Sequence, residues 1–231
     1  MTIKVGTLPG WRDAPAGYVF AHIDLHTGDG AIIHSRSTPH LADARWHATT
    51  VLGVCRDGKV AIAADGQVTF GDMVVKHGAR KIRVLHEGQV LAGFAGAAAD
   101  ALTLFEKFEA QLVTWKGDLR KAAVELAKEW RIDRELRRLE AQLIVANEHD
   151  ILILSGEGDV LQPDDGIASI GSGSPYATAA ARALAGHTTM TPIEIVKEAM
   201  RISSELCIFT NEHITIFSLP NDTDTEDGVE E

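Results

Sequence analysis

Two adjacent threonines, Thr49 and Thr50, stand where a histidine-rich leader gives way to an alternating apolar stretch. A threonine at the start of a chain carries a hydroxyl nucleophile and a free α-amine that can act as its base. The α-amine has an ordinary pKa of about 7.7–8.0, so a useful fraction is unprotonated near neutral pH. Cleavage between Ala48 and Thr49 would therefore create a residue that contains both nucleophile and base.

Such a nucleophile needs charged support, and two residues have the right types. Asp65 ends the next apolar stretch, and Lys81 opens a later one. A lysine beside the amine would disfavour its protonation and stabilise the developing alkoxide, while an aspartate would hold the lysine in its charged form. Backbone N–H groups at the glycine-rich run 93–96 would serve an oxyanion. On spacing alone, a Thr-Thr pair at a strand start is more often a matter of β propensity than of catalysis.

The elements that must position these residues form two β blocks, each followed by two helices. Predicted strands cover residues 51–56, 59–64, 67–70, 73–76, 81–85, 89–94, 142–146, 150–155 and 167–170. Predicted helices cover 98–113, 119–139, 176–185 and 192–206, and a closing hairpin joins 207–210 to 213–217. Two mainly antiparallel sheets stacked face to face, with a helix pair outside each, would bury the apolar face of every element.

Composition excludes several classes of protein. The 231 residues suit one domain with tails, and the net charge is −11. Without its acidic tail the chain is only mildly acidic, which argues against nucleic acid as a partner. The acidic tail supplies six of the negative charges: Asp222, Asp224, Glu226, Asp227, Glu230 and Glu231. Cys55 and Cys207 lack paired spacing, which fits a reducing cytosol. No apolar run reaches the roughly 18 residues of a membrane span, and no secretion signal is present, so we expect a cytoplasmic protein without a membrane partner.

Three segments are expected: a leader over 1–48, a domain over 49–219 and an acidic, disordered tail over 220–231. The leader contains short candidate strands at 18–24 and 31–34. Its five histidines, at 22, 26, 34, 40 and 47, match no metal-ligand spacing. It is either a propeptide that shields Thr49 or a leader that comes from an over-long gene model.

Specific runs occur in collinear order along the domain. They are 49–51 (TTV), 64–67 (ADGQ), 80–83 (RKIR), 92–96 (AGFAG), 100–106 (DALTLFE), 121–131 (KAAVELAKEWR) and 170–173 (IGSG). Together they resemble the HslV family, the proteolytic subunits of bacterial ATP-dependent HslUV proteases and relatives of proteasome β-subunits. The resemblance covers essentially the whole domain. It implies an α+β fold, the four-layer αββα sandwich of N-terminal-nucleophile hydrolases, and a threonine endopeptidase.

The resemblance also implies roles for individual residues. Thr49 matches the nucleophile and, through its amine, the base. Asp65 and Lys81 match the supporting aspartate and lysine. The amide of Gly93 matches the oxyanion position, and Ser172 matches a serine near the N-terminal amine.

A cation and a partner follow from the same resemblance. The family binds a monovalent cation, usually sodium, through backbone carbonyls that match Ser204, Cys207 and Thr210. Two stacked hexameric rings, a homododecamer, enclose the threonines. The AAA+ unfoldase HslU caps the rings, activates the peptidase allosterically and delivers unfolded proteins, and its C-terminal tail meets basic residues that match Lys76 and Arg83.

Nucleotide is not expected on this subunit, because the run 171–175 lacks the Gly-Lys-Ser/Thr ending of a P-loop. One departure from the family is the length of chain before Thr49. It leaves open a catalytically silent ring scaffold that retains its leader. An amidase acting on small amides is a third reading, which the absence of an inserted substrate-binding subdomain disfavours.

Overall fold

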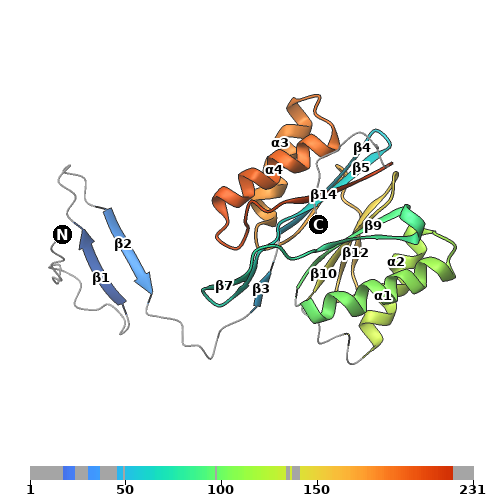
Figure 1. Ribbon diagram of the computed structural model, residues 1–231, viewed down its shortest axis with the longest axis horizontal. Helices are drawn as coiled ribbons and strands as arrows, with labels where there is room; N and C mark the ends of the chain where they lie inside the picture. The colour runs from blue at the N-terminus through green and yellow to red at the C-terminus, as the bar shows by residue number, and fades with distance from the viewer. Residues whose placement is uncertain are drawn as a thin grey trace. The chain divides into compact units, whose positions relative to one another are not determined.

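The computed structural model describes residues 18–23, 31–36, 46–48, 50–96, 98–133, 136 and 141–220 (Figure 1). Thr49 and the tail from residue 221 onward lie outside the described residues. The chain divides into two compact units, residues 1–44 and 45–231. In the smaller unit, β1 (Tyr18–Ile23) pairs antiparallel with β2 (Ala31–Arg36), close to the two strands predicted there.

The larger unit contains two main antiparallel sheets and one small one. The four-stranded sheet has the order β13 (Ile167–Gly171), β4 (Thr50–Arg56), β5 (Lys59–Ala64), β14 (Thr215–Leu219). The five-stranded sheet has the order β12 (Val160–Leu161), β11 (Ile151–Ser155), β10 (Gln142–Ala146), β9 (Val90–Ala95), β8 (Ile82–Leu85). The small sheet has the order β3 (Trp46–Ala48), β6 (Val68–Phe70), β7 (Met73–Lys76).

Helix pairs cover the outer faces of the two main sheets (Figure 1). Helices α1 (Ala98–Thr114) and α2 (Leu119–Ile132) pack on the five-stranded sheet, and α3 (Ser174–His187) and α4 (Pro192–Leu206) pack on the four-stranded sheet. A third buried cluster lies between the sheets. The predicted αββα sandwich is therefore confirmed.

Strand alternation explains how one strand serves two cores. Along β4, Val51 belongs to the cluster between the sheets, whereas Leu52 and Val54 belong to the cluster beneath α3 and α4. Glycine lets the sheets approach closely, because a Cβ on Gly53 would lie 2.5 Å from Cδ1 of Ile151. The start of β4 is thereby fixed between two packed layers.

Two predicted elements differ from the structure. The helix predicted over 119–139 ends at Ile132, where Asp133 takes an extended conformation (ψ 126°) and its carboxylate accepts the Leu136 N–H at 3.2 Å. The indole N–H of Trp130 donates to the Leu136 carbonyl at 2.9 Å, so the chain folds back on the helix end. The predicted residues 134–135 and 137–139 lie outside the described part of the chain.

The predicted closing hairpin is also wrong. Residues 207–210 form a turn, in which the Thr210 N–H donates to the Cys207 carbonyl at 3.0 Å. The last strand, β14, pairs instead with β5, from Thr215 opposite Ala64 to Leu219 opposite Val60. The turn is held by side-chain contacts with residues distant in sequence, described below.

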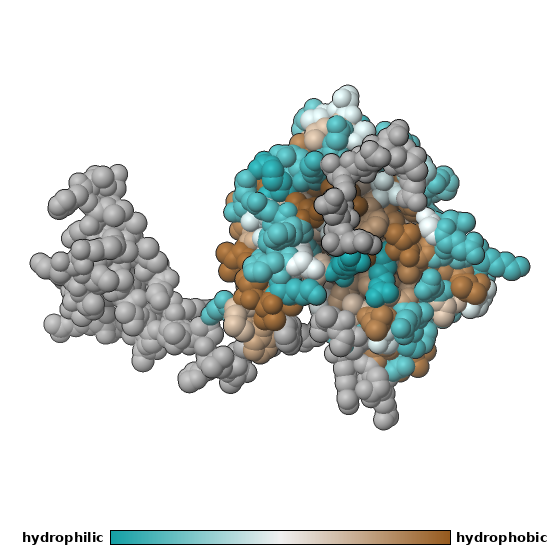
Figure 2. Space-filling model, in the orientation of Figure 1, coloured by the Kyte–Doolittle hydropathy of each residue, from teal (hydrophilic) through white to brown (hydrophobic). Residues whose placement is uncertain are grey.

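Apolar side chains also reach the surface. Met73, Val74 and Val75 on β7 are exposed, and brown side chains gather at that edge of the larger unit in Figure 2. Among the described residues, no helix combines the length and the apolar character needed to cross a membrane.

Candidate functional site

The candidate site lies where three strands of the four-stranded sheet end together. Thr50 is the first residue of β4 and is paired with Gly171, the last residue of β13. On its other side, Asp65 follows the last residue of β5 and donates its backbone N–H to the Thr50 carbonyl at 3.2 Å. Thr49 precedes Thr50 in the chain, so the sheet fixes the residue to which the candidate nucleophile is attached.

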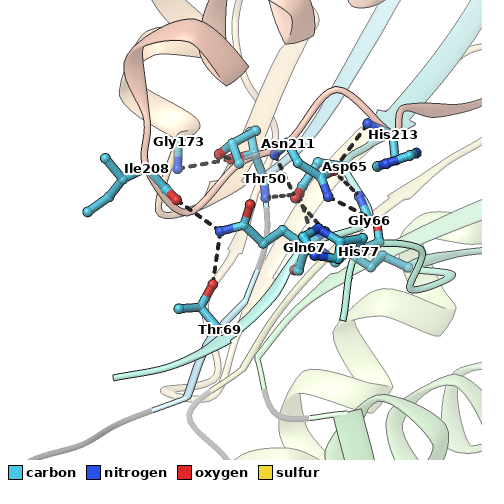
Figure 3. Close-up of polar contacts among 12 residues, drawn as sticks. Thr50, Asp65, Gly66, Gln67, Thr69, His77, Gly173, Ile208, Asn211 and His213 are labelled. Atoms are coloured by element: carbon cyan, nitrogen blue, oxygen red, sulfur yellow. Dashed lines mark hydrogen bonds and ion pairs between the residues drawn. The ribbon is translucent and has the colours of Figure 1, made fainter. Parts of the chain in front are cut away.

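The Asp65 carboxylate is buried and fully hydrogen-bonded (Figure 3). Its Oδ1 accepts the Thr50 N–H at 2.7 Å and the Lys81 ammonium at 2.9 Å. Its Oδ2 accepts the N–H groups of Gln67 at 2.8 Å and Asn211 at 3.4 Å. Because both oxygens have two donors, the carboxylate is fixed in orientation and tied to the backbone beside the candidate nucleophile.

Lys81 is the cation of this pair, with only 7% of its surface exposed. Its Nζ also donates to the Gln67 carbonyl at 2.6 Å. Burial lowers the pKa of Lys81 below the ordinary lysine value of 10.5, while the charge and hydrogen bond of Asp65 act in the opposite direction. The expected contact between Asp65 and Lys81 is present, and the supporting role of the pair in a reaction stays a prediction.

The hydroxyl of Thr50 is committed to structure. Thr50 is 0% exposed, its Oγ1 accepts the Gly173 N–H at 3.0 Å, and it lies 2.7 Å from Oγ1 of Thr210. Ser203 completes the cluster by donating its hydroxyl to the Gly173 carbonyl at 3.1 Å. A buried hydroxyl with two partners is poorly placed to attack a substrate, so of the two adjacent threonines Thr49 is the better nucleophile.

Gly93 lies inside β9, paired with Ile82 on one side and Ile144 on the other. The neighbouring Phe94 N–H donates to the Lys81 carbonyl at 3.0 Å, so by strand alternation the Gly93 N–H faces β10. A Cβ at Gly93 would lie 2.6 Å from Cγ1 of Val51, which gives this glycine a packing role. The oxyanion role of Gly93 stays a prediction, and Gly96, just past the strand end with a φ of 148°, is a second candidate donor.

Ser172 follows Gly171, the residue paired with Thr50, in the turn that leads into α3. It is partly buried. Ser172 therefore lies next in the chain to the partner of Thr50, close to where Thr49 joins the sheet. Its role in the reaction stays a prediction.

The residues expected to bind a cation lie at the end of α4. Ser204 is in the last helical turn, Cys207 is the C-cap, and Thr210 ends the following turn. Carbonyls at a helix C-terminus lack intrahelical partners and lie at the negative end of the macrodipole, and hard cations prefer oxygen ligands. The Cys207 carbonyl already accepts the Thr210 N–H at 3.0 Å, and the cation site stays a prediction. No cluster of three or more His, Cys, Asp or Glu side chains suited to a metal occurs in the described part of the chain.

The predicted partner-binding residues are exposed. Lys76 ends β7, and Arg83 lies on β8 with its guanidinium carbon 5.6 Å from the centre of the Phe105 ring. Both positions leave a positive charge accessible to an acidic group.

Two further residues join the site, although the sequence analysis assigned them no role. Gln67 donates its side-chain amide to Thr69 Oγ1 and to the Ile208 carbonyl, each at 2.9 Å. Asn211 follows the turn after α4 and contacts Asp65. Gln67 belongs to the 64–67 run, but nothing in the sequence marks Asn211, because its partners are distant in the chain.

Comparisons with known proteins agree on one family. The family model described as proteasome subunit matches residues 46–219. The ATP-dependent protease subunit HslV of Pseudothermotoga lettingae is 61% identical over 171 residues, 74% of this chain and 97% of that protein. The same-named subunit of Syntrophobacter fumaroxidans is 57% identical over 173 residues, which cover 75% and 97% of the two chains.

Solved structures give the same result. The crystal structure of eukaryotic HslV from Trypanosoma brucei matches with a TM-score of 0.71 and 45% identity, over 74% of this chain and 98% of that one. The Thiobacillus denitrificans protein BPH matches with a TM-score of 0.56 and 22% identity, over 74% and 97% of the chains, which shows a shared fold.

Proposed function

The chain belongs to the proteasome family, in its HslV group, and we propose that it is the threonine-type endopeptidase subunit of an ATP-dependent protease. The observation that carries the proposal is the buried Asp65–Lys81 pair bonded to the backbone of Thr50. A buried ion pair gives little net stability, since desolvation offsets its attraction. A reaction that begins at Thr49, the residue before Thr50, would give this ion pair a function.

In the proposed reaction, Thr49 Oγ1 attacks the carbonyl carbon of a peptide bond, and its proton passes to the Thr49 α-amine directly or through a water. Collapse of the tetrahedral intermediate breaks the C–N bond, and the proton goes to the leaving amine. A water then hydrolyses the resulting ester and releases the second product. The charge of Lys81 lowers the energy of the alkoxide and keeps the amine unprotonated.

The edge of β6 is the proposed binding place for peptides. In the uncut chain this edge carries β3, residues 46–48, with Trp46 opposite Phe70 and Ala48 opposite Val68. An extended peptide that adds a strand to this edge would run toward Thr49, just as the leader does. The leader therefore competes with substrates, and peptidase activity requires its removal.

The proposal includes the wider assembly of the group. We expect a cytoplasmic homododecamer of two hexameric rings, with a sodium ion on the carbonyls of Ser204, Cys207 and Thr210. The AAA+ partner HslU would deliver unfolded proteins, and its C-terminal carboxylate would meet Lys76 and Arg83. The exposed basic side chains support this contact.

The decisive experiment compares the unmodified chain with Thr49→Ala. We expect Thr49→Ala to abolish peptide cleavage while rings still assemble, and Thr49→Ser to retain part of the activity. Intact mass and N-terminal sequencing should find a chain that begins at Thr49 and reacts with an epoxyketone. A chain that keeps its leader and does not react would favour the silent scaffold, and cleavage by Thr49→Ala would exclude a threonine mechanism.

A further inference from the structure

We infer that Asn211 is a positioning residue for the reaction, which holds Asp65 in the orientation that supports Lys81 and Thr49. The inference rests on the proposed threonine peptidase function. Asn211 lies in the segment between α4 and β14, outside the residues to which the sequence analysis gave a role. Figure 3 shows it between His213, Gly66 and Asp65.

The backbone N–H and the side-chain amide of Asn211 hydrogen-bond to Asp65 and to the backbone around it. Its backbone N–H donates to Asp65 Oδ2 at 3.4 Å. Its side-chain Oδ1 accepts the N–H groups of Gly66 at 3.1 Å and His213 at 3.2 Å, and its Nδ2 donates to the His77 carbonyl at 2.9 Å. One side chain thus joins three segments of backbone.

The contacts need an amide. Two N–H donors point at one oxygen, and a carbonyl acceptor faces the nitrogen, which only a group with both an acceptor and a donor can satisfy. Aspartate has the same shape but cannot donate to the His77 carbonyl. Gly66 allows the close approach, since a Cβ there would lie 2.1 Å from the His77 oxygen.

The effect on chemistry passes through Asp65. Gly66 follows Asp65 directly, so Asn211 holds both the carboxylate and the backbone that carries it. Gln67 adds a second link between these segments through the Ile208 carbonyl. Truncation of the Asn211 side chain keeps its backbone N–H but releases the Gly66 backbone, which follows Asp65 directly. The carboxylate then gains freedom to turn away from Lys81, and the interaction that raises the pKa of Lys81 weakens.

Asn211→Ala should therefore lower kcat by roughly 10-fold to 100-fold, the scale of a misplaced catalytic group, with little change in KM. The alkaline limb of the kcat profile should move to lower pH, because Lys81 loses its proton more easily. The titratable groups near this segment are those of Asp65, Lys81, His77, Glu212 and His213. The two histidines have ring centres 6.3 Å apart.

The test measures kcat, KM and the pH profile of the assembled, leader-free protein, with active sites counted by epoxyketone labelling. Glu212→Ala is the matched control, since this exposed neighbour should leave all three values unchanged. If Asn211→Ala fails to assemble, the isosteric Asn211→Asp takes its place and should also lower kcat per labelled site, because a carboxylate cannot donate to the His77 carbonyl.

An unchanged kcat per labelled site and an unchanged alkaline limb would overturn the inference. So would a loss of activity explained entirely by fewer labelled sites, which would indicate a purely structural role. Thr49→Ala distinguishes the two proposals: if it remains active, the threonine mechanism fails, whereas an active Asn211→Ala beside an inactive Thr49→Ala refutes only the positioning role.

Discussion

At the scale of the residue, Lys81 has two opposing influences on its charge. Burial favours the neutral form, and Asp65 at 2.9 Å favours the charged form, with burial the larger cause. In the folded protein its pKa therefore lies below 10.5, so the unfolded chain binds more protons in the interval between the two values. The contribution of Lys81 to stability accordingly rises with pH through that interval.

Activity should respond in the opposite sense. Since the alkoxide needs a positive neighbour, kcat should fall as Lys81 loses its proton, with a midpoint below the 10.5 of an ordinary lysine. Lys81→Arg keeps its charge at high pH, and any residual activity it has should lack this alkaline limb. The measurement is kcat against pH for both proteins, with circular dichroism to show that each stays folded. If Lys81→Arg loses kcat at the same alkaline pH as the unmodified protein, a group other than Lys81 causes that loss.

At the scale of the element, the turn between β13 and α3 determines whether the hydroxyl cluster can form. A Cβ at Gly173 would lie 2.2 Å from Thr50 Oγ1, 2.6 Å from Ser203 Oγ and 2.7 Å from Thr210 Oγ1. The three residues are buried and come from β4, from α4 and from the turn that follows α4. The glycine is thus required by space rather than by backbone conformation, as its φ is −89°.

Gly173→Ala should destabilise the protein by about 1–3 kcal/mol, the usual cost of overpacking, and should reduce cleavage because Thr50 is displaced. Gly186→Ala, near the end of α3, is the matched control, since a Cβ there meets nothing within 4 Å. Alanine at that helical position should stabilise by about 0.5–1 kcal/mol. Urea denaturation of both variants checks the difference, and equal stabilities would show that the cluster tolerates the extra carbon.

The same scale shows what a sequence can predict. Sequence signals predict an element correctly where the contacts that form it are local. Asp57 and Gly58, both with positive φ, make the hairpin turn between β4 and β5. Thr191 and Glu194 make the capping box of α4. The prediction of a closing hairpin is wrong because the hydroxyl of Thr210, at the end of the turn, contacts the hydroxyl of Thr50, 160 positions away in the chain. Asn211 escaped prediction for the same reason, whereas Asp65 and Lys81 were found because chemistry restricts their types.

At the scale of the whole molecule, the uncut chain contains both the β6 edge proposed to bind peptides and a segment, β3, that pairs with that edge. Strand β3 belongs with the larger unit, so the structural division falls after residue 44 rather than after 48, where cleavage is predicted. Its pairing with β6 places leader backbone along the edge proposed for substrates. Under the proposed function, this contact would hold the chain inactive until the peptide bond before Thr49 is cut.

A synthetic peptide of residues 41–48 should therefore inhibit the leader-free protein competitively, because it restores the strand on β6 without the covalent link. In an antiparallel pair, successive N–H groups point alternately toward and away from the partner strand. N-methylation at His47 and N-methylation at Ala48 should consequently differ: one should abolish inhibition by removing a ladder bond, and the other should leave it nearly intact. Inhibition constants from peptide-cleavage assays measure both effects. Inhibition that is non-competitive, or that both methyl groups reduce equally, would mean that the leader acts elsewhere and that the pairing of β3 with β6 does not describe how this enzyme is held inactive.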